Sequence, residues 1–136
     1  MKTGLKLKND LMEMDRLLDC VLAFGKENEL SDDFVWEIRL VLEEVVTNII
    51  SYGYEDKAEH EIEVNIVNAN EDITVSVRDD ARPFNLLEHP RPDLEIPIEN
   101  RRIGGMGIHI VREIMDEIDY KREEGINLLV MRRRKL

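Results

Sequence analysis

One predicted helix carries polar side chains that suit metal and proton chemistry. Glu44, Thr47, Asn48 and Ser51 follow one another at spacings of three and four residues, so they share one helix face. The amide oxygen of Asn48 can ligate Mg²⁺ without adding charge, while phosphate oxygens and waters complete the shell. A carboxylate one turn away, that of Glu44, can polarise a hydroxyl. Taken alone, the same spacing also fits an ordinary solvated helix face.

An acidic pair ends a predicted strand. Asp79 continues the inward row of Ile73, Val75 and Val77, whereas Asp80 continues the outward row. A carboxylate on the buried side needs a hydrogen-bond donor, and the amino group of a ligand can supply one. A local Asx turn before Pro83 or an internal ion pair would satisfy the same carboxylate, and the sequence leaves these alternatives open.

A glycine-rich stretch, Gly104-Gly105-Met106-Gly107, opens an apolar run with helical spacing (Ile108, Val111, Ile114 or Met115, Ile118). A glycine turn at a helix N-terminus directs backbone N–H groups and the positive end of the helix dipole at one place, which favours a phosphate. Such turns also serve as plain loops. The segment upstream is rich in proline and lacks periodicity, so we predict that residues 85–103 form a lid over the bound phosphates.

The histidines suggest no catalytic base or zinc site. His109 lies in the predicted first turn of the glycine-led helix, where we expect a surface or lid contact. His60 and His89 have no partner at a metal-ligand spacing.

These residues need a scaffold, and the pattern predicts one. A strand over residues 4–8 precedes a helix that starts at an Asp10–Glu13 capping box and runs to about residue 28. A longer helix follows from Ser31 to Tyr52 and stops at Gly53. Alternating strands around Ile62–Ile66 and Ile73–Val77 flank a turn, and two final strands cover about 117–122 and 126–133. The order predicts an α+β two-layer sandwich with helices on one face of a mostly antiparallel sheet.

Composition narrows the function class. The 136 residues suffice for one domain, and the net charge of −11 argues against nucleic-acid and anionic-membrane binding. The basic run from Arg132 to Lys135 reads as a solvated strand end. Cys20 is the only cysteine, which excludes an intrachain disulfide. Neither a signal peptide nor an apolar span is visible, so we expect a cytoplasmic protein.

Three segments together resemble the motifs of the Bergerat-fold ATPases, which include gyrase and the sensor histidine kinases. Glu44 to Asn48 resembles their N box, Asp79 to Phe84 resembles their Asp-x-Gly-x-Pro-Phe box, and Gly104 to Ile108 resembles their second glycine box. The compact form is most similar to the bacterial anti-sigma-factor serine/threonine kinases, over about residues 8–134. This resemblance implies a single histidine-kinase-like domain over 1–136, with about three helices on one face of a mixed, mostly antiparallel sheet.

The resemblance also implies roles for individual residues. Asn48 would bind Mg²⁺ between the phosphates of ATP, Asp79 would accept a hydrogen bond from the adenine amino group, and Glu44 would activate the hydroxyl of a protein substrate. Gly104, Gly105 and Gly107 would wrap the phosphates, and Asn127 would replace a Thr or Ser that supports adenine in relatives. The nucleotide-binding set implied in this way is Asn48, Asp79, Ala81, Phe84, Gly104, Gly105, Met106, Gly107, Ile108 and Asn127.

One position departs from the pattern, because Ala81 stands where the family has glycine. Its methyl group could crowd adenine, and a positive φ there would add strain of about 1 kcal/mol, so we expect weakened nucleotide binding at most. The resemblance implies a kinase that phosphorylates an anti-sigma-factor antagonist protein on Ser or Thr and sequesters a sigma factor, with a homodimer left open. The alternative is a non-catalytic module that binds ATP or ADP and a protein partner.

Overall fold

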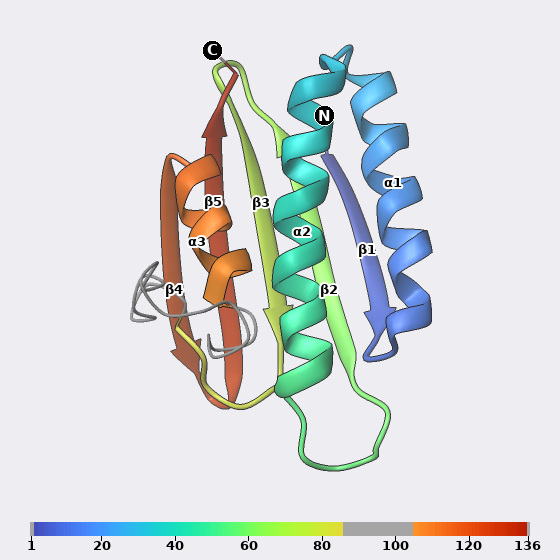
Figure 1. The fold of residues 1–136 in the computed structure, drawn as a ribbon, viewed down its shortest axis with the longest axis vertical. Coiled ribbons are helices and arrows are strands. Elements are labelled where there is room, and N and C mark those ends of the chain that lie inside the picture. Colours follow the sequence, from blue (N-terminus) through green and yellow to red (C-terminus); the bar gives the residue numbers. More distant parts are fainter. Residues whose placement is uncertain (1, 86–104, 136) are drawn as a thin grey trace.

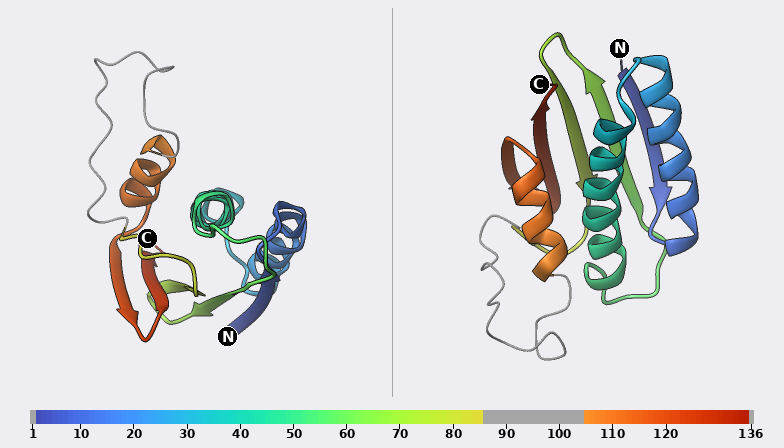
Figure 2. Two further views of the ribbon diagram at one scale, coloured as in Figure 1. Left: turned by 90° about the horizontal axis from the view of Figure 1, so that it is seen from below. Right: turned by 45° about the horizontal axis from the view of Figure 1, so that its top comes forward.

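The computed structural model describes residues 2–85 and 105–135, and within them three α-helices lie on one face of a five-stranded sheet (Figures 1 and 2). The predicted α+β two-layer sandwich is therefore confirmed. In chain order the elements are β1 (Lys2–Lys8), a 3-10 turn (Leu11–Glu13), α1 (Met14–Glu27), α2 (Asp32–Tyr52), β2 (Glu61–Asn68), β3 (Asp72–Asp79), α3 (Gly105–Ile114), β4 (Glu117–Glu123) and β5 (Ile126–Arg134).

The sheet has the strand order β1-β2-β3-β5-β4, and each of these neighbouring pairs is antiparallel. The sequence prediction allowed a mixed sheet, and that part is corrected for the described strands. β5 is inserted between β3 and β4, so the last strand of the chain lies beside the end of β3. Its register places Asn127 directly opposite Asp79.

The core lies between the sheet and the helix layer. α2 runs between α1 and α3 (Figure 1) and buries the predicted stripe of Ile38, Val41, Leu42 and Val45, while Ile49 is partly buried. Burial of one such side chain stabilises a fold by about 1.5–3 kcal/mol. The sheet contributes the inward rows of β2 and β3, which are Ile62, Val64, Ile66, Ile73, Val75 and Val77. Among the described helices, none combines the length and the apolar character that crossing a membrane requires.

Two helical segments begin at N-cap residues, Asp10 and Ser31. Ser31 Oγ accepts a hydrogen bond from the backbone N–H of Phe34 at 3.2 Å, which caps α2. Asp10 caps its turn in the same way, through Met12 N–H at 2.9 Å. The predicted reciprocal bond of a capping box is absent, because Glu13 accepts from the N–H of Lys8 instead. The α-helical segment therefore begins only at Met14.

The helix α3 differs from its prediction at both ends. Gly105 and Gly107 lie within its first turn rather than in a preceding loop. The helix stops at Ile114, because the N–H of Asp116 already donates to the carbonyl of Arg132 in β5 at 2.8 Å. Ile118 therefore belongs to β4 rather than to the helical stripe. Gly104 and the predicted lid, apart from Asn85, lie outside the described residues.

Candidate functional site

A cleft of about 400 Å³ opens between α2, α3 and the ends of β3 and β5. Its walls are mainly apolar, with a few polar groups that converge on it, as is usual for small-molecule sites. The lining side chains are Glu44, Val45, Asn48, Ile49, Tyr52, Gly53, Asp79, Ala81, Arg82, Phe84, Ile108, Val111, Tyr120, Asn127 and Leu129. Seven of the residues predicted from the sequence are among them (Glu44, Asn48, Asp79, Ala81, Phe84, Ile108 and Asn127).

The polar face predicted on α2 divides in the structure. Glu44 and Asn48, one turn apart, both line the cleft. Thr47 does not, because its hydroxyl contacts Met14 Sδ of α1 at 4.0 Å. Ser51 is exposed and also lies outside the cleft lining. Of the polar side chains on this face of α2, only Glu44 and Asn48 therefore line the cleft.

Glu44 lies against the first turn of α3. A side chain placed on Gly107 would collide with the Glu44 carboxylate, so only glycine permits this close approach. Partial burial raises the pKa of Glu44, and the charge of Glu43 adds to the effect. A carboxyl group with a raised pKa is a better proton acceptor than an ordinary surface glutamate.

The carboxylate of Asp79 is buried at the end of β3, with 6% of the residue exposed. Its Oδ1 accepts from Ala81 N–H at 3.0 Å and from Asn127 Nδ2 at 2.9 Å. The first bond is the Asx turn that the sequence left open, and no ion pair of Asp79 is present among the described residues. Burial raises the pKa of Asp79, and the bonds from Asn127 and Ala81 oppose that rise. Within the described chain Oδ2 forms no hydrogen bond, so it can accept from a ligand.

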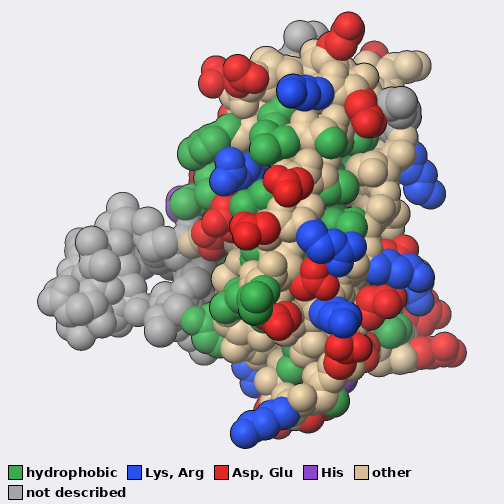
Figure 3. Space-filling model, turned by 90° about the vertical axis from the view of Figure 1, so that its right-hand side faces the viewer, with side chains coloured by type: hydrophobic (Ala, Val, Ile, Leu, Met, Phe, Trp, Pro, Cys, Tyr) green, Lys and Arg blue, Asp and Glu red, His purple; other side chains and the backbone are tan. Residues whose placement is uncertain are grey.

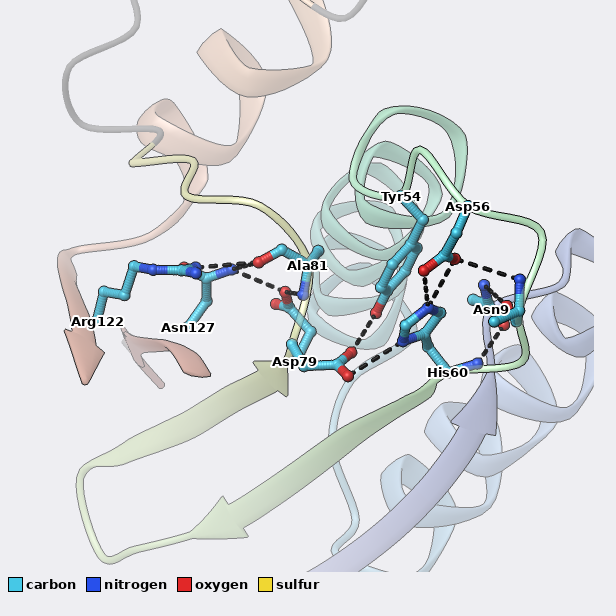
Figure 4. Close-up of polar contacts among 10 residues, drawn as sticks. Asn9, Tyr54, Asp56, His60, Asp79, Ala81, Arg122 and Asn127 are labelled. Atoms are coloured by element: carbon cyan, nitrogen blue, oxygen red, sulfur yellow. Dashed lines mark hydrogen bonds and ion pairs between the residues drawn. The ribbon is translucent and has the colours of Figure 1, made fainter. Parts of the chain in front are cut away.

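Asn127 connects this carboxylate to the following turn and to β4 (Figure 4). Its Nδ2 also donates to the carbonyls of Ala81 at 3.0 Å and Arg82 at 3.1 Å. Its Oδ1 accepts from Arg122 Nη1 at 2.8 Å and from the hydroxyl of Tyr120. Tyr120 and Arg122 were not predicted from the sequence, because their role depends on cross-strand register rather than on a motif.

Ala81 is accommodated without the strain considered above. Among the described residues only Glu29 and Glu124 are non-glycine residues with positive φ, so the backbone at Ala81 is ordinary. The residue is 4% exposed and packs against Gly53, where an added Cβ would lie 2.7 Å from the Ala81 methyl carbon. The missing side chain of Gly53 thus provides room for the methyl group.

A second polar cluster lies beside the cleft, in the segment between α2 and β2 (Figure 4). His60 contacts Asp56 Oδ1 through Nε2 at 2.8 Å and Asp80 Oδ2 through Nδ1 at 3.1 Å. Tyr54 stacks on the imidazole with ring centroids 4.3 Å apart and donates to Asp80 at 3.2 Å. Hydrogen bonds that the imidazole donates to the carboxylates, first to Asp56 and then to Asp80, raise the pKa of His60. The i, i+4 spacing of Asp56 and His60 was the only sequence signal for this cluster.

The remaining expectations concern metals and glycines. His109 lies in the second turn of α3, with Nε2 3.7 Å from Glu113, and does not line the cleft. Within the described ranges no group of three or more His, Cys, Asp or Glu side chains is placed to hold a metal ion. Gly105 and Met106 are described only as helical backbone, and Gly104 and His89 lie outside the described residues.

A family model and proteins of known family both match this chain. Residues 7–133 match the model of the histidine kinase-like ATPase domain. The chain is 30% identical over 111 residues to an anti-sigma F factor of Bacillus thuringiensis, covering 81% of this chain and 75% of that protein. An anti-sigma F factor of Oceanobacillus iheyensis is 26% identical over 99 residues, covering 73% of this chain and 68% of the relative.

Solved structures share the fold at low sequence identity. The RsbU and RsbW domains of Rv1364c from Mycobacterium tuberculosis superpose with a TM-score of 0.71 at 13% identity, covering 98% of this chain and 32% of that longer chain. The catalytic domain of the histidine kinase ThkA gives a TM-score of 0.54 at 17% identity, covering 98% of this chain and 96% of that domain.

Proposed function

Because the chain belongs to the histidine kinase-like ATPase domain family, we propose that its cleft binds Mg-ATP and that the protein is an anti-sigma-factor-like serine/threonine kinase. The observation that carries this proposal is the meeting of two functional pairs in one cleft. Glu44 and Asn48 come from the middle of α2, and Asp79 and Asn127 come from the paired ends of β3 and β5.

The adenine end of the cleft is formed by β3 and β5. Asp79 would accept a hydrogen bond from the adenine amino group through Oδ2, the oxygen without a protein partner in the described chain. Apolar side chains of three different elements (Ile49, Ile108 and Leu129) line the cleft and suit a flat, weakly polar base. Ala81 and Phe84 extend this wall beyond the end of β3.

The phosphate end would lie between Asn48 and the N-terminal turn of α3. Gly105 and Gly107 of that turn present helix N-terminal backbone to an anion. The donor set fits magnesium, because the amide oxygen of Asn48 is a hard, neutral ligand and the phosphates supply the anionic oxygens. Bound there, Mg²⁺ would neutralise charge on the transferred phosphoryl group.

Glu44 would act as the general base for phosphoryl transfer. Its carboxylate takes the proton of a substrate Ser or Thr hydroxyl as the hydroxyl oxygen bonds to the γ-phosphorus. The bond from that phosphorus to the oxygen bridging to the β-phosphate breaks, and ADP leaves with the electron pair. The raised pKa of Glu44 supports this role.

The protein substrate would be a small anti-sigma-factor antagonist. The protein would also sequester a sigma factor by binding it. Similarity to the anti-sigma F factors supports these partners. The net charge of −11 favours protein partners over nucleic acid or an anionic membrane. A homodimer is compatible with this function.

A non-catalytic ATP- or ADP-binding module is the second candidate, and the departure from glycine at Ala81 favours it. The presence of Glu44 in the cleft favours the kinase. Radiolabelled ATP incubated with candidate antagonists from the neighbouring operon separates the two. We expect Glu44→Gln to bind Mg-ATP within a few-fold of wild type but to transfer phosphate at least about a hundredfold more slowly, because a positioned base contributes about 10²–10⁴ in rate.

The matched control is Asp33→Asn, which removes the same charge from an exposed position of α2 that does not neighbour Glu44. Transfer by Glu44→Gln at the wild-type rate would exclude Glu44 as the base. Nucleotide-dependent partner binding without transfer by the wild type would support the module instead.

A further inference from the structure

Arg122 on the edge strand β4 does not line the cleft. It contacts Asn127 and the carbonyl of Ala81, which do line it beside Asp79. The register places Arg122 opposite Asn127, and Asn127 opposite Asp79. Residues directly opposite one another in adjacent strands lie on the same face, so the three side chains form a row across β4, β5 and β3. Figure 4 shows this row, with Arg122 at the end remote from His60.

Arg122 makes two contacts through one nitrogen. Its Nη1 lies 2.8 Å from Asn127 Oδ1 and 3.0 Å from the carbonyl oxygen of Ala81. Arginine has donors only, so whatever atom of Asn127 faces it must be the acceptor, the amide oxygen. The amide nitrogen must then face the other way, toward Asp79 Oδ1 and the carbonyls of Ala81 and Arg82.

The reverse orientation of the amide would be unfavourable on both sides. Asn127 Oδ1 would meet the Asp79 carboxylate and two carbonyl oxygens, and Nδ2 would meet the guanidinium. A buried acceptor that faces another acceptor carries the cost of an unmade hydrogen bond. The acceptors on the Asp79 side favour the observed orientation, and Arg122 supplies the matching fixed donor on the other side. Tyr120 cannot replace it, because a hydroxyl can either donate or accept.

We infer that Arg122 is a positioning residue: it fixes the Asn127 amide so that the Asp79 carboxylate and the turn at Ala81 are held ready for a ligand. The identification of that ligand as adenine rests on the proposed function. Arg122 is itself exposed on an edge strand, so its loss leaves the hydrophobic core intact. Its contribution is therefore to the site rather than to the fold.

Several charged or titratable groups besides Arg122 surround Asp79, and the test must separate them. Two lie close to Asp79: Asp80, which directly follows the end of β3, and Tyr54 after α2. Others line the same cleft: Glu44 from α2, Tyr120 from β4, and Arg82 beyond β3. From α3 the described lining residues are the apolar Ile108 and Val111. Among the described residues Tyr120 and Arg122 both reach Asp79 through Asn127, and of the two only Arg122 is a fixed donor.

The experiment measures Asp79 in the nucleotide-free protein, by carboxyl-carbon NMR titration of Arg122→Met and Arg122→Gln. Lys121→Met is the control, because Lys121 is the exposed neighbour on the same strand and, among the described residues, pairs only with Glu123, at 3.8 Å. Thermal melts verify folding. Calorimetry with Mg-ATP near neutral pH gives the affinity of each variant.

We expect both Arg122 variants to raise the Asp79 pKa and to weaken Mg-ATP binding about tenfold, as for loss of a charge-assisted hydrogen bond, while Lys121→Met changes neither. The Arg122 charge also lowers the Asp79 pKa directly. If Arg122 acts through Asn127 as well, adding Arg122→Met to Asn127→Thr should cause a smaller pKa shift than in the wild-type background. An equal shift in both backgrounds, or Arg122 variants that match Lys121→Met, would overturn the inference. A wild type that binds no Mg-ATP, with the expected Asp79 shifts, would overturn the proposed function and leave the positioning role supported.

Discussion

His60 is held by two carboxylates and a stacked phenol, although its sequence context suggested no partner. Hydrogen bonds that the imidazole donates to Asp56 and Asp80 raise its pKa in the folded protein above the ordinary value of 6.5. Asp80 directly follows Asp79, so the cluster connects the segment after α2 to the strand end that carries Asp79. Protonation of this imidazole therefore strengthens its contacts with the two carboxylates.

This pairing predicts a specific pH dependence of stability. A raised folded-state pKa means that the folded protein binds the proton more tightly than the unfolded chain. The stabilisation is fully present below about pH 6.5 and is lost as pH rises through the folded pKa. We therefore expect the difference in unfolding free energy between wild type and His60→Gln to be largest at about pH 5.5 and to shrink by about pH 8.5, in urea titrations. A difference that stays constant with pH would show that the imidazole contributes only by packing.

Single residues also show where sequence reasoning reached its limit. Motif order predicted residues that lie together in the cleft, including Glu44, Asn48 and Asp79. It missed Tyr120 and Arg122, which meet Asn127 only because β5 pairs with β4 and β3 at once. The β4–β5 pairing is a local hairpin, but the meeting of this pair with Asp79 depends on the pairing of β5 with β3, which are far apart in the chain. The chemical roles of all these residues remain predictions.

At the scale of elements, periodicity and caps predicted most of the fold. The Ser31 cap, the apolar stripe of α2 and the alternation in β2 and β3 are short-range signals, and each element is present. Helical spacing alone misplaced the end of α3, since Ile118 continues the period, whereas the strand predicted over about 117–122 is confirmed as β4. Pairing of Asp116 with the carbonyl of Arg132 decides that boundary, and this is a long-range contact.

The junction between α2 and the turn after β3 makes a prediction about packing. Gly53 ends α2 with φ of −84°, a conformation open to any residue, so its glycine is required by space alone. A Cβ there would lie 2.5 Å from the Ile49 carbonyl oxygen and 2.7 Å from the Ala81 Cβ. We expect Gly53→Ala to lower the free energy of unfolding by about 1–3 kcal/mol, as overpacking does, measured by urea denaturation.

Gly4→Ala is the matched control for this junction. Its added Cβ would lie 2.7 Å from Asn65 Oδ1, the end of a side chain that can rotate away. Both substitutions reduce the freedom of the unfolded chain to the same extent. Equal stability changes in the two variants would therefore contradict a rigid contact between Gly53 and Ala81.

At the scale of the whole molecule, net charge affects how a partner approaches, and the arrangement of helices and strands determines which elements a ligand in the cleft contacts. On the α1 side, acidic and basic side chains alternate with scattered hydrophobic ones, so no single-sign patch dominates that face (Figure 3). The net charge of −11 nevertheless sets the long-range field that an approaching partner meets. The cleft draws its walls from α2, α3, β3 and β5, so one ligand would join elements from most of the chain.

That architecture predicts that Mg-ATP stabilises the fold as a unit. A ligand that binds only the folded state at about a hundred times its Kd adds about 2.7 kcal/mol to the unfolding free energy. For a domain of 136 residues this corresponds to a rise in Tm of roughly 5–15 °C. Thermal melts monitored by circular dichroism, with ATP alone and with Mg-ATP, measure the rise and its dependence on the metal.

Asn48→Ala tests whether the metal acts where we propose. It removes the amide oxygen that would bridge Mg²⁺ to α2, so the extra stabilisation by Mg²⁺ over ATP alone should fall away while the nucleotide-free Tm changes little. Ser51→Ala, on the same helix but outside the cleft lining, should keep the full Mg-ATP shift. If millimolar Mg-ATP leaves the wild-type Tm unchanged, the cleft is not a nucleotide site. If Asn48→Ala retains the complete Mg²⁺-dependent rise, the metal is held by other groups and the assignment of Asn48 is wrong.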